Sequence, residues 1–210
     1  YAAVLLSSGA RDSGENEFQA AAQLRPDAPR RNNLAMLHLA LGDATRAAQD
    51  VFAAHDLPRA IELATVLLAR APPVDAGRQR IGWTIIGQSH FDQAVYEQSE
   101  PAFQRALALA PAGSPEHADL TERLAAAVYR QGEAKRKAGD EAGAAGDFLR
   151  VATVAPASKV VPTAQYDAAA ALINARQWSQ AITVLEAYRR DYPRSEFAAD
   201  ITRKLAVVYV

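Results

Sequence analysis

The sequence predicts an all-α protein, a solenoid of antiparallel helix pairs, on the strength of three observations. Alanine supplies much of the 50% hydrophobic fraction, while aromatic residues make up only 7%, and alanine favours helices that pack closely. Few segments show the alternating Val, Ile and Thr pattern of strands. Proline recurs after helix-like stretches, at intervals of 46, 39, 45 and 37 residues. These prolines are Pro26, Pro72, Pro111, Pro156 and Pro193.

The clearest pattern lies in the stretch that begins at Trp83. Spacings of three and four residues place its marked positions on one face of a first helix and then of a second. The glycine lets a neighbouring helix approach, the phenylalanine fills the space between small residues, and the final proline ends the second helix. One such pair cannot bury its apolar stripe alone, so it needs neighbouring pairs. The marked positions are Trp83, Ile86, Gly87, His90, Ser99, Phe103, Ala106 and Pro111.

This pattern resembles the tetratricopeptide repeat, a unit of about 34 residues whose motif runs Trp-x2-Leu-Gly-x2-Tyr, then small, aromatic, small and a closing proline. Ile86, His90 and Ser99 are mild departures from the motif. The resemblance implies a right-handed superhelical solenoid of antiparallel tetratricopeptide-like helix pairs. It also implies a scaffold or adaptor that binds a peptide or a partner protein on the concave face of the superhelix.

When each of these prolines is taken as the end of a repeat, the chain divides into an N-terminal part, 1–72, and a C-terminal part, 73–210. Turns are expected at Gly42-Asp43 and Gly139-Asp140, because glycine suits a helix end and aspartate caps the helix that follows. Trp178-Ser179 is expected to form a turn as well. The expected repeats are, in order, a truncated one over 1–28, irregular ones over 29–54 and 55–72, then 80–113, 116–158, 162–195 and a partial one over 196–210.

The repeat pattern is irregular between residues 43 and 58. Here one short helix must serve as the second helix of one pair and the first helix of the next. Two explanations are open. Either this repeat is degenerate, or the sequence skips residues near Asp50 and Val51. A skip would separate those two Cα atoms by far more than the roughly 3.8 Å of a trans peptide.

Composition excludes several classes of function. The net charge is −1, with 23 basic and 24 acidic residues, which argues against nucleic acid as the partner. There is no cysteine, and hence no disulfide, thiolate chemistry or cysteine metal site. No apolar run approaches the length of a membrane span. The chain starts at Tyr1 without a visible signal peptide, as expected of an excised or processed fragment.

No catalytic, cofactor or metal site is expected. The four histidines stand in no metal-ligand spacing; His90 is expected in the core, and His38, His55 and His117 at the surface or in turns. The glycine-rich run over 139–147 lacks the Lys-Ser/Thr of a phosphate loop. The chain is therefore predicted not to be an enzyme.

The candidate binding residues follow from the resemblance, which places groove side chains at the second, fifth, ninth, twelfth and thirteenth positions of each unit. Such polar and aromatic groups suit an extended or helical peptide. The alternative is that they only pack against the neighbouring repeat. The two-asparagine, three-basic clamp of chaperone-binding members is absent. The candidates are Asn32, Met36, Thr84, Gln88, Phe91, Asp92, Tyr129, Glu133, Arg136, Lys137, Tyr166, Ile173 and Asn174.

A weaker similarity concerns location. The phrase from Tyr192 to Tyr209 is similar to repeats of bacterial envelope proteins, such as outer-membrane assembly lipoproteins and the Tol–Pal accessory protein. It favours the periplasm or cell envelope over the cytoplasm. Two other roles stay open beside the scaffold: a structural spacer or oligomerisation arm without a peptide ligand, and a non-catalytic domain of a larger enzyme.

Overall fold

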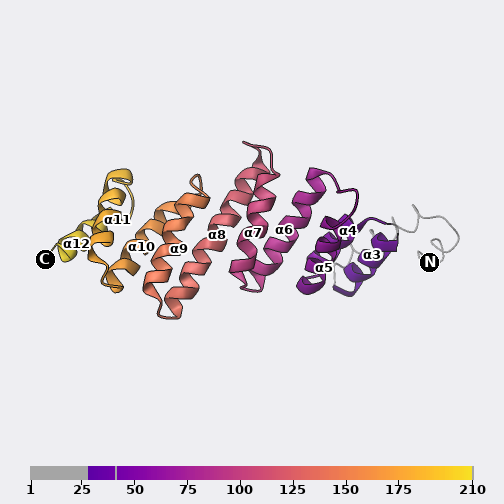
Figure 1. The fold of residues 1–210 in the computed structure, drawn as a ribbon, viewed down its shortest axis with the longest axis horizontal. Helices are drawn as coiled ribbons and strands as arrows, with labels where there is room; N and C mark the ends of the chain where they lie inside the picture. The colour runs from indigo at the N-terminus through magenta and orange to yellow at the C-terminus, as the bar shows by residue number, and fades with distance from the viewer. Residues whose placement is uncertain (1–27, 41, 210) are drawn as a thin grey trace. The chain divides into compact units, whose positions relative to one another are not determined.

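The computed structural model describes residues 28–40 and 42–209, and every regular element in those ranges is an α-helix (Figure 1). This confirms the predicted all-α, tetratricopeptide-like solenoid. The expected repeat end over 1–27 lies outside the described residues. The helices are α3 (Ala28–Ala40), α4 (Ala44–Ala53), α5 (Leu57–Leu68), α6 (Ala76–Asp92), α7 (Tyr96–Ala108), α8 (Pro115–Lys137), α9 (Glu141–Val154), α10 (Val161–Asn174), α11 (Trp178–Asp191) and α12 (Ala198–Val208).

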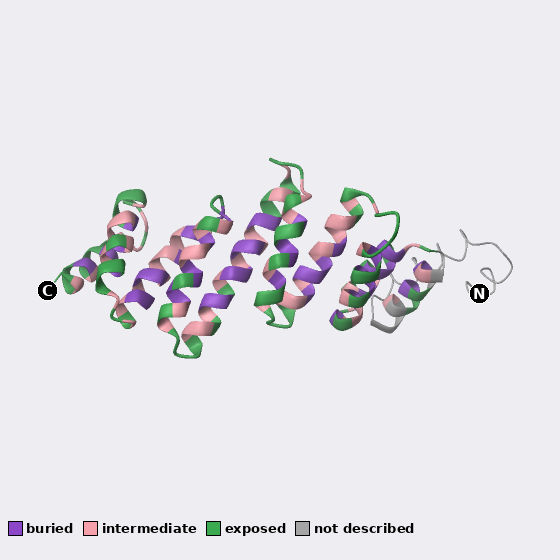
Figure 2. Cartoon of the chain, in the orientation of Figure 1, coloured by how far each residue is buried: buried purple, intermediate pink, exposed green. Residues whose placement is uncertain are grey.

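The helices group into two compact units, divided after Ala110. In the first unit, α3 to α7 each pack on the next, and α4 also contacts α6. In the second unit, α8 to α12 do the same, and α8 also contacts α10. The residue 72/73 boundary expected from the sequence falls between α5 and α6, which pack against each other. In both units the buried residues lie where neighbouring helices meet (Figure 2).

The irregular segment is a continuous helix. α4 runs through Asp50 and Val51, and the Ala54 N–H donates to the Asp50 carbonyl at 2.9 Å. It packs on α3, α5 and α6. In this arrangement one short helix closes one pair and opens the next.

Close packing in the pairs depends on glycine facing phenylalanine. Phe103 is fully buried, and a Cβ added to Gly87 would lie 2.7 Å from its Cδ1 atom. The same arrangement recurs one repeat later, where a Cβ on Gly132 would lie 2.7 Å from Cδ1 of Phe148. Protein cores are too densely packed to absorb such an overlap without a shift. The glycines therefore let α7 and α9 approach α6 and α8.

Most turns follow the sequence prediction. Gly42 and Gly139 have φ angles of +81° and +85°, a region open to glycine. Asp43 and Asp140 cap the helices that follow by accepting from backbone N–H groups. The expected turn at Trp178-Ser179 differs: the turn precedes Trp178, which already starts α11.

Two of the histidine predictions need correction. His38 was expected at the surface, but it is only 3% exposed, and its Nδ1 lies 2.6 Å from an Asp50 carboxylate oxygen. The pair links α3 to α4, so His38 belongs to the packing between them. Burial raises the pKa of Asp50, while the hydrogen bond to His38 opposes that rise. His90 was expected in the core but is only half-buried, and this partial burial lowers its pKa.

Candidate functional site

The predicted site residues of the second unit form bridges between successive first helices of the pairs. The Tyr129 hydroxyl on α8 donates to Asp167 on α10 at 2.6 Å, and Arg136 donates to the other oxygen of the same carboxylate at 2.9 Å. The ring of Phe148 lies 5.1 Å from the Tyr129 ring. Tyr129 and Arg136 are therefore engaged within the chain and hold α8 to α10.

The same bridge recurs between α10 and α12. The Tyr166 hydroxyl donates to Asp200 at 2.8 Å, and the Tyr166 ring stacks on Phe197 with 4.2 Å between centroids. Arg203 and Lys204 also reach the Asp200 carboxylate, at 3.1 and 3.2 Å. A tyrosine on one first helix thus meets an aspartate on the next, twice in succession.

The bridges change the acid–base behaviour of their members. Burial raises the pKa of Tyr129 well above its usual range, and its hydrogen bond to Asp167 adds to the rise. The pKa of Tyr166 is raised to about 12, mainly by its hydrogen bond to Asp200 and to a smaller extent by burial. The Tyr166 hydroxyl is the main cause that lowers the pKa of Asp200 to about 2. Both phenols therefore stay protonated and act as donors at neutral pH.

The Tyr166→Phe variant is expected to raise the pKa of Asp200 toward about 3.9, the ordinary value for aspartate. The ring stays in place, but the main group that favours the ionised carboxylate is lost. A lowered folded-state pKa stabilises the fold above the unfolded value, and that stabilisation is lost as the pH falls from about 4 toward about 2. The wild type should therefore lose stability more steeply in this range than the variant.

A carboxyl-carbon NMR titration measures this pKa directly. Tyr129→Phe is the matched control, because it removes the same hydroxyl from the other bridge and should leave Asp200 unchanged. An unchanged Asp200 pKa in Tyr166→Phe would contradict the bridge.

The other predicted residues are distributed along several helices. On α6, Gln88 donates to Asp92 at 2.7 Å, Thr84 donates to the Arg80 carbonyl at 2.8 Å, and Phe91 meets the ring of Tyr96 edge-on. Three further residues contact their own or a neighbouring pair: Glu133 accepts from Arg130, Asn174 donates to Glu141, and Ile173 packs against the core around Leu185. Met36 and Lys137 are exposed, and the side chain of Asn32 lies outside the described residues.

A cleft of about 250 Å³ opens between α4 and α6, the helices that start consecutive pairs. Of the predicted residues, Thr84 alone lines it. Ile81 occupies the second position of its unit, so the groove pattern could have included it. Gln49 and Phe52 had no such signal, because α4 had two possible assignments. The lining residues are Gln49, Phe52, Arg80, Ile81, Thr84 and Ile85.

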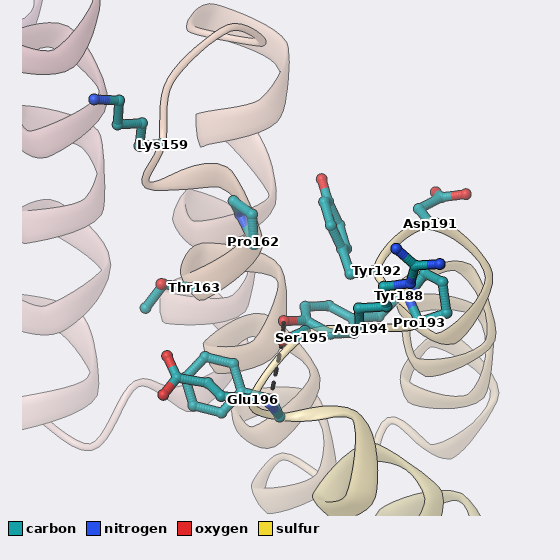
Figure 3. Close-up of a pocket in the computed structure, with 11 residues that line it drawn as sticks. Lys159, Pro162, Thr163, Tyr188, Asp191, Tyr192, Pro193, Arg194, Ser195 and Glu196 are labelled. Atoms are coloured by element: carbon teal, nitrogen blue, oxygen red, sulfur yellow. Dashed lines mark hydrogen bonds between the residues drawn. The ribbon is translucent and has the colours of Figure 1, made fainter.

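A second cleft, of about 530 Å³, lies at the helix ends of the second unit (Figure 3). The start of α10, the end of α11 and the connection to α12 form its walls. None of the predicted site residues lines it. The repeat motif describes helix faces, so it carries no information about this connection.

Residues 163–195, which cover most of α10 and all of α11, match the sequence model of the tetratricopeptide repeat. The chain therefore contains a tetratricopeptide repeat over these residues. The match coincides with the repeat that the sequence placed at 162–195. It therefore contains Tyr166 and Asp167, which take part in the two bridges. No described helix is both long and apolar enough to cross a membrane.

Two solved structures resemble this chain. One is a chain of the APC/C hetero-tetramer Cut9–Hcn1, at 17% identity and a TM-score of 0.37; the match covers 98% of this chain and 41% of that one. The other is a thermophilic tetratricopeptide-repeat protein of Thermus thermophilus, at 15% identity and a TM-score of 0.34, with 99% and 95% of the two chains covered. The chain thus spans less than half the length of the first. No curated protein sequence matches it.

Proposed function

We propose that this protein is a non-catalytic interaction scaffold that binds an extended segment of a partner protein along the first helices of its pairs. The cleft between α4 and α6 takes one apolar side chain of that segment. The near-neutral charge supports a protein rather than a nucleic acid as partner. The similarity of residues 192–209 to envelope repeats favours a place in a larger bacterial assembly at the cell envelope.

The observation that carries the proposal is the chemistry of the α4–α6 cleft. Phe52, Ile81 and Ile85 give it an apolar lining, and Arg80 lies beside them. Its volume of about 250 Å³ is below the roughly 300–1,000 Å³ of small-molecule sites. A single anchoring side chain fits such a space. The Arg80 guanidinium has no ion-pair partner among the described residues, so the ligand is expected to carry a carboxylate next to its apolar anchor.

Capture of partners from native cells on the immobilised chain tests this proposal. Thr84→Tyr fills the cleft, and Arg80→Glu reverses its charge. Each should reduce capture of specific partners by about tenfold, which corresponds to about 1.4 kcal/mol. Arg78→Glu is the matched control, because Arg78 is exposed two residues away and does not line the cleft. A photo-crosslinker at position 84 should then label a partner segment that pairs an apolar residue with an acidic one.

Equal capture by the wild type and both cleft variants, with helicity unchanged by circular dichroism, would place binding elsewhere on the molecule.

A rigid spacer is the second candidate function for residues 111–210, because the tyrosines expected as anchors there bridge the chain's own helices. In that case Tyr129→Ala and Tyr166→Ala would lower stability and leave capture unchanged.

A further inference from the structure

The cleft at the helix ends of the second unit differs from the groove that the repeat family implies. It is lined by side chains from the first turn of α10, from the last turn of α11 and from the connection 192–197. Figure 3 shows Thr163 on the α10 side and Tyr192 on the α11 side of the cleft. The cleft lies wholly in the second unit, so its occupancy can be tested separately from that of the α4–α6 cleft.

Both walls of this cleft are held by hydrogen bonds. On one side, the Glu122 carboxylate on α8 accepts from the Ser158 hydroxyl at 2.7 Å and from the Lys159 N–H at 3.0 Å. On the other side, Ser195 Oγ lies 2.7 Å from the Tyr188 hydroxyl and accepts from the Phe197 N–H at 3.1 Å. A cleft held in this way loses little conformational freedom when a ligand enters it.

The surface of the cleft combines rings with hydrogen-bond donors. Tyr192 and Phe197 supply aromatic rings, of which Phe197 also stacks on Tyr166, and Pro162 and Pro193 line the cleft as well. The Tyr192 hydroxyl and the hydroxyl of Thr163 have no hydrogen-bond partner among the described residues. Burial raises the pKa of Tyr192, which keeps its hydroxyl protonated as a donor.

Some charged side chains of the cleft form ion pairs with other described residues, and others do not. Lys159 and Arg194 line it, and neither has an ion-pair partner in the described part of the chain. The Asp191 carboxylate is occupied by Arg190, at 2.7 and 3.1 Å. Glu196 is the lining carboxylate without such a pair among the described residues, and its negative charge disfavours a ligand with several acidic groups. The balance favours a ligand with one carboxylate.

We propose that this cleft binds a proline-rich segment of a partner protein that carries one acidic residue. Proline has no N–H, so a polyproline chain presents carbonyl acceptors and apolar rings. Grooves lined by aromatic residues suit such chains because the extended conformation is already formed before binding. The free hydroxyl of Tyr192 matches a carbonyl, and the exposed guanidinium of Arg194 matches the single carboxylate.

NMR titration of the isotopically labelled full chain with synthetic peptides tests this proposal. The probe is a capped polyproline peptide with one central aspartate; one comparison peptide carries asparagine at that place, and another carries alanines for the prolines. Amide shifts are expected around the cleft, at residues such as Thr163, Tyr192 and Arg194. The asparagine peptide should bind about tenfold more weakly, since it lacks the charge-assisted bonds. The alanine peptide should produce no saturable shift.

Variants separate the cleft from the rest of the surface. Arg194→Glu and Tyr192→Ala should each weaken binding of the aspartate peptide by about tenfold or more. Their matched controls are Arg176→Glu and Trp178→Ala, which change an exposed arginine and an exposed aromatic residue outside the cleft. Arg194 is itself exposed, so its variant tests the cleft even where Tyr192→Ala perturbs packing.

Three outcomes would overturn the proposal: no saturable shift with the aspartate peptide, equal binding of the alanine peptide, or unchanged binding in Arg194→Glu. The result is independent of the proposed groove function. A peptide that shifts Gln49 and Thr84 instead would support the α4–α6 cleft and reject this one.

Discussion

The Phe103→Ala variant is expected to lower the free energy of unfolding by about 3–5 kcal/mol, the usual loss for a buried phenylalanine. Phe103 is fully buried, and its ring lies against the bare backbone of Gly87. The neighbours on its own helix face, Ser99, Ala102 and Ala106, are small and cannot fill the space left by the ring. Each repeat contacts only its neighbours, so a loss in one pair has few other contacts to offset it.

Urea denaturation of the full chain, followed by circular dichroism, measures the loss. Phe91→Ala is the matched control in the same pair, because Phe91 is half-buried and meets Tyr96 with 5.3 Å between ring centroids. It should cost about 1 kcal/mol, as for an aromatic pair at an edge. Similar losses in the two variants would show that Phe103 is not the packing centre of the pair.

The spacing of residues predicted this part of the fold well. Ser99, Phe103 and Ala106 recur at helical intervals with one large residue between two small ones, and all three are buried. Gly87 stands where only the absence of a side chain allows the ring to enter. These features are local, and the physical reason for each is visible in the sequence. The turns at Gly42 and Gly139 were predictable for the same reason.

The partners of buried and half-buried polar side chains could not be predicted in this way. Tyr129 and Asp167 are 38 residues apart, and Tyr166 and Asp200 are 34 apart. Periodicity places such a tyrosine on a helix face, but the same face suits either a ligand or the next repeat. The predicted surface position of His38 was wrong for a similar reason. Its partner Asp50 lies on the next helix, and no sequence motif marks the pair.

The clefts show where a repeat motif stops being informative. Thr84 and Ile81 hold motif positions, so a groove along α6 was foreseeable. Lys159 and Arg194 lie in connections, where the repeat pattern specifies no residue type. Only the folded chain brings the end of one helix beside the start of another.

The Asp147→Ala variant is expected to cost about 2 kcal/mol, because it removes a buried carboxylate that joins two helices. Asp147 on α9 is only 3% exposed, and it lies 2.6 Å from Lys135 on α8 and 2.7 Å from Arg150. The two cations are themselves 38% and 43% exposed. Water can therefore solvate them once the carboxylate is gone, which keeps the loss below that of a fully buried pair.

Asp119→Ala is the matched control in the same unit. Asp119 pairs with Arg123 on the surface of α8, with 58% of its side chain exposed, and such pairs contribute less than about 1 kcal/mol. Raising the salt concentration should diminish the small effect at Asp119 and leave the larger one at Asp147, since salt screens buried charges weakly. Equal losses at the two sites would mean that Asp147 does not hold α8 to α9. With Lys135 bound to Asp147 and Arg136 to Asp167, two of the three basic residues at the end of α8 join it to the neighbouring helices α9 and α10.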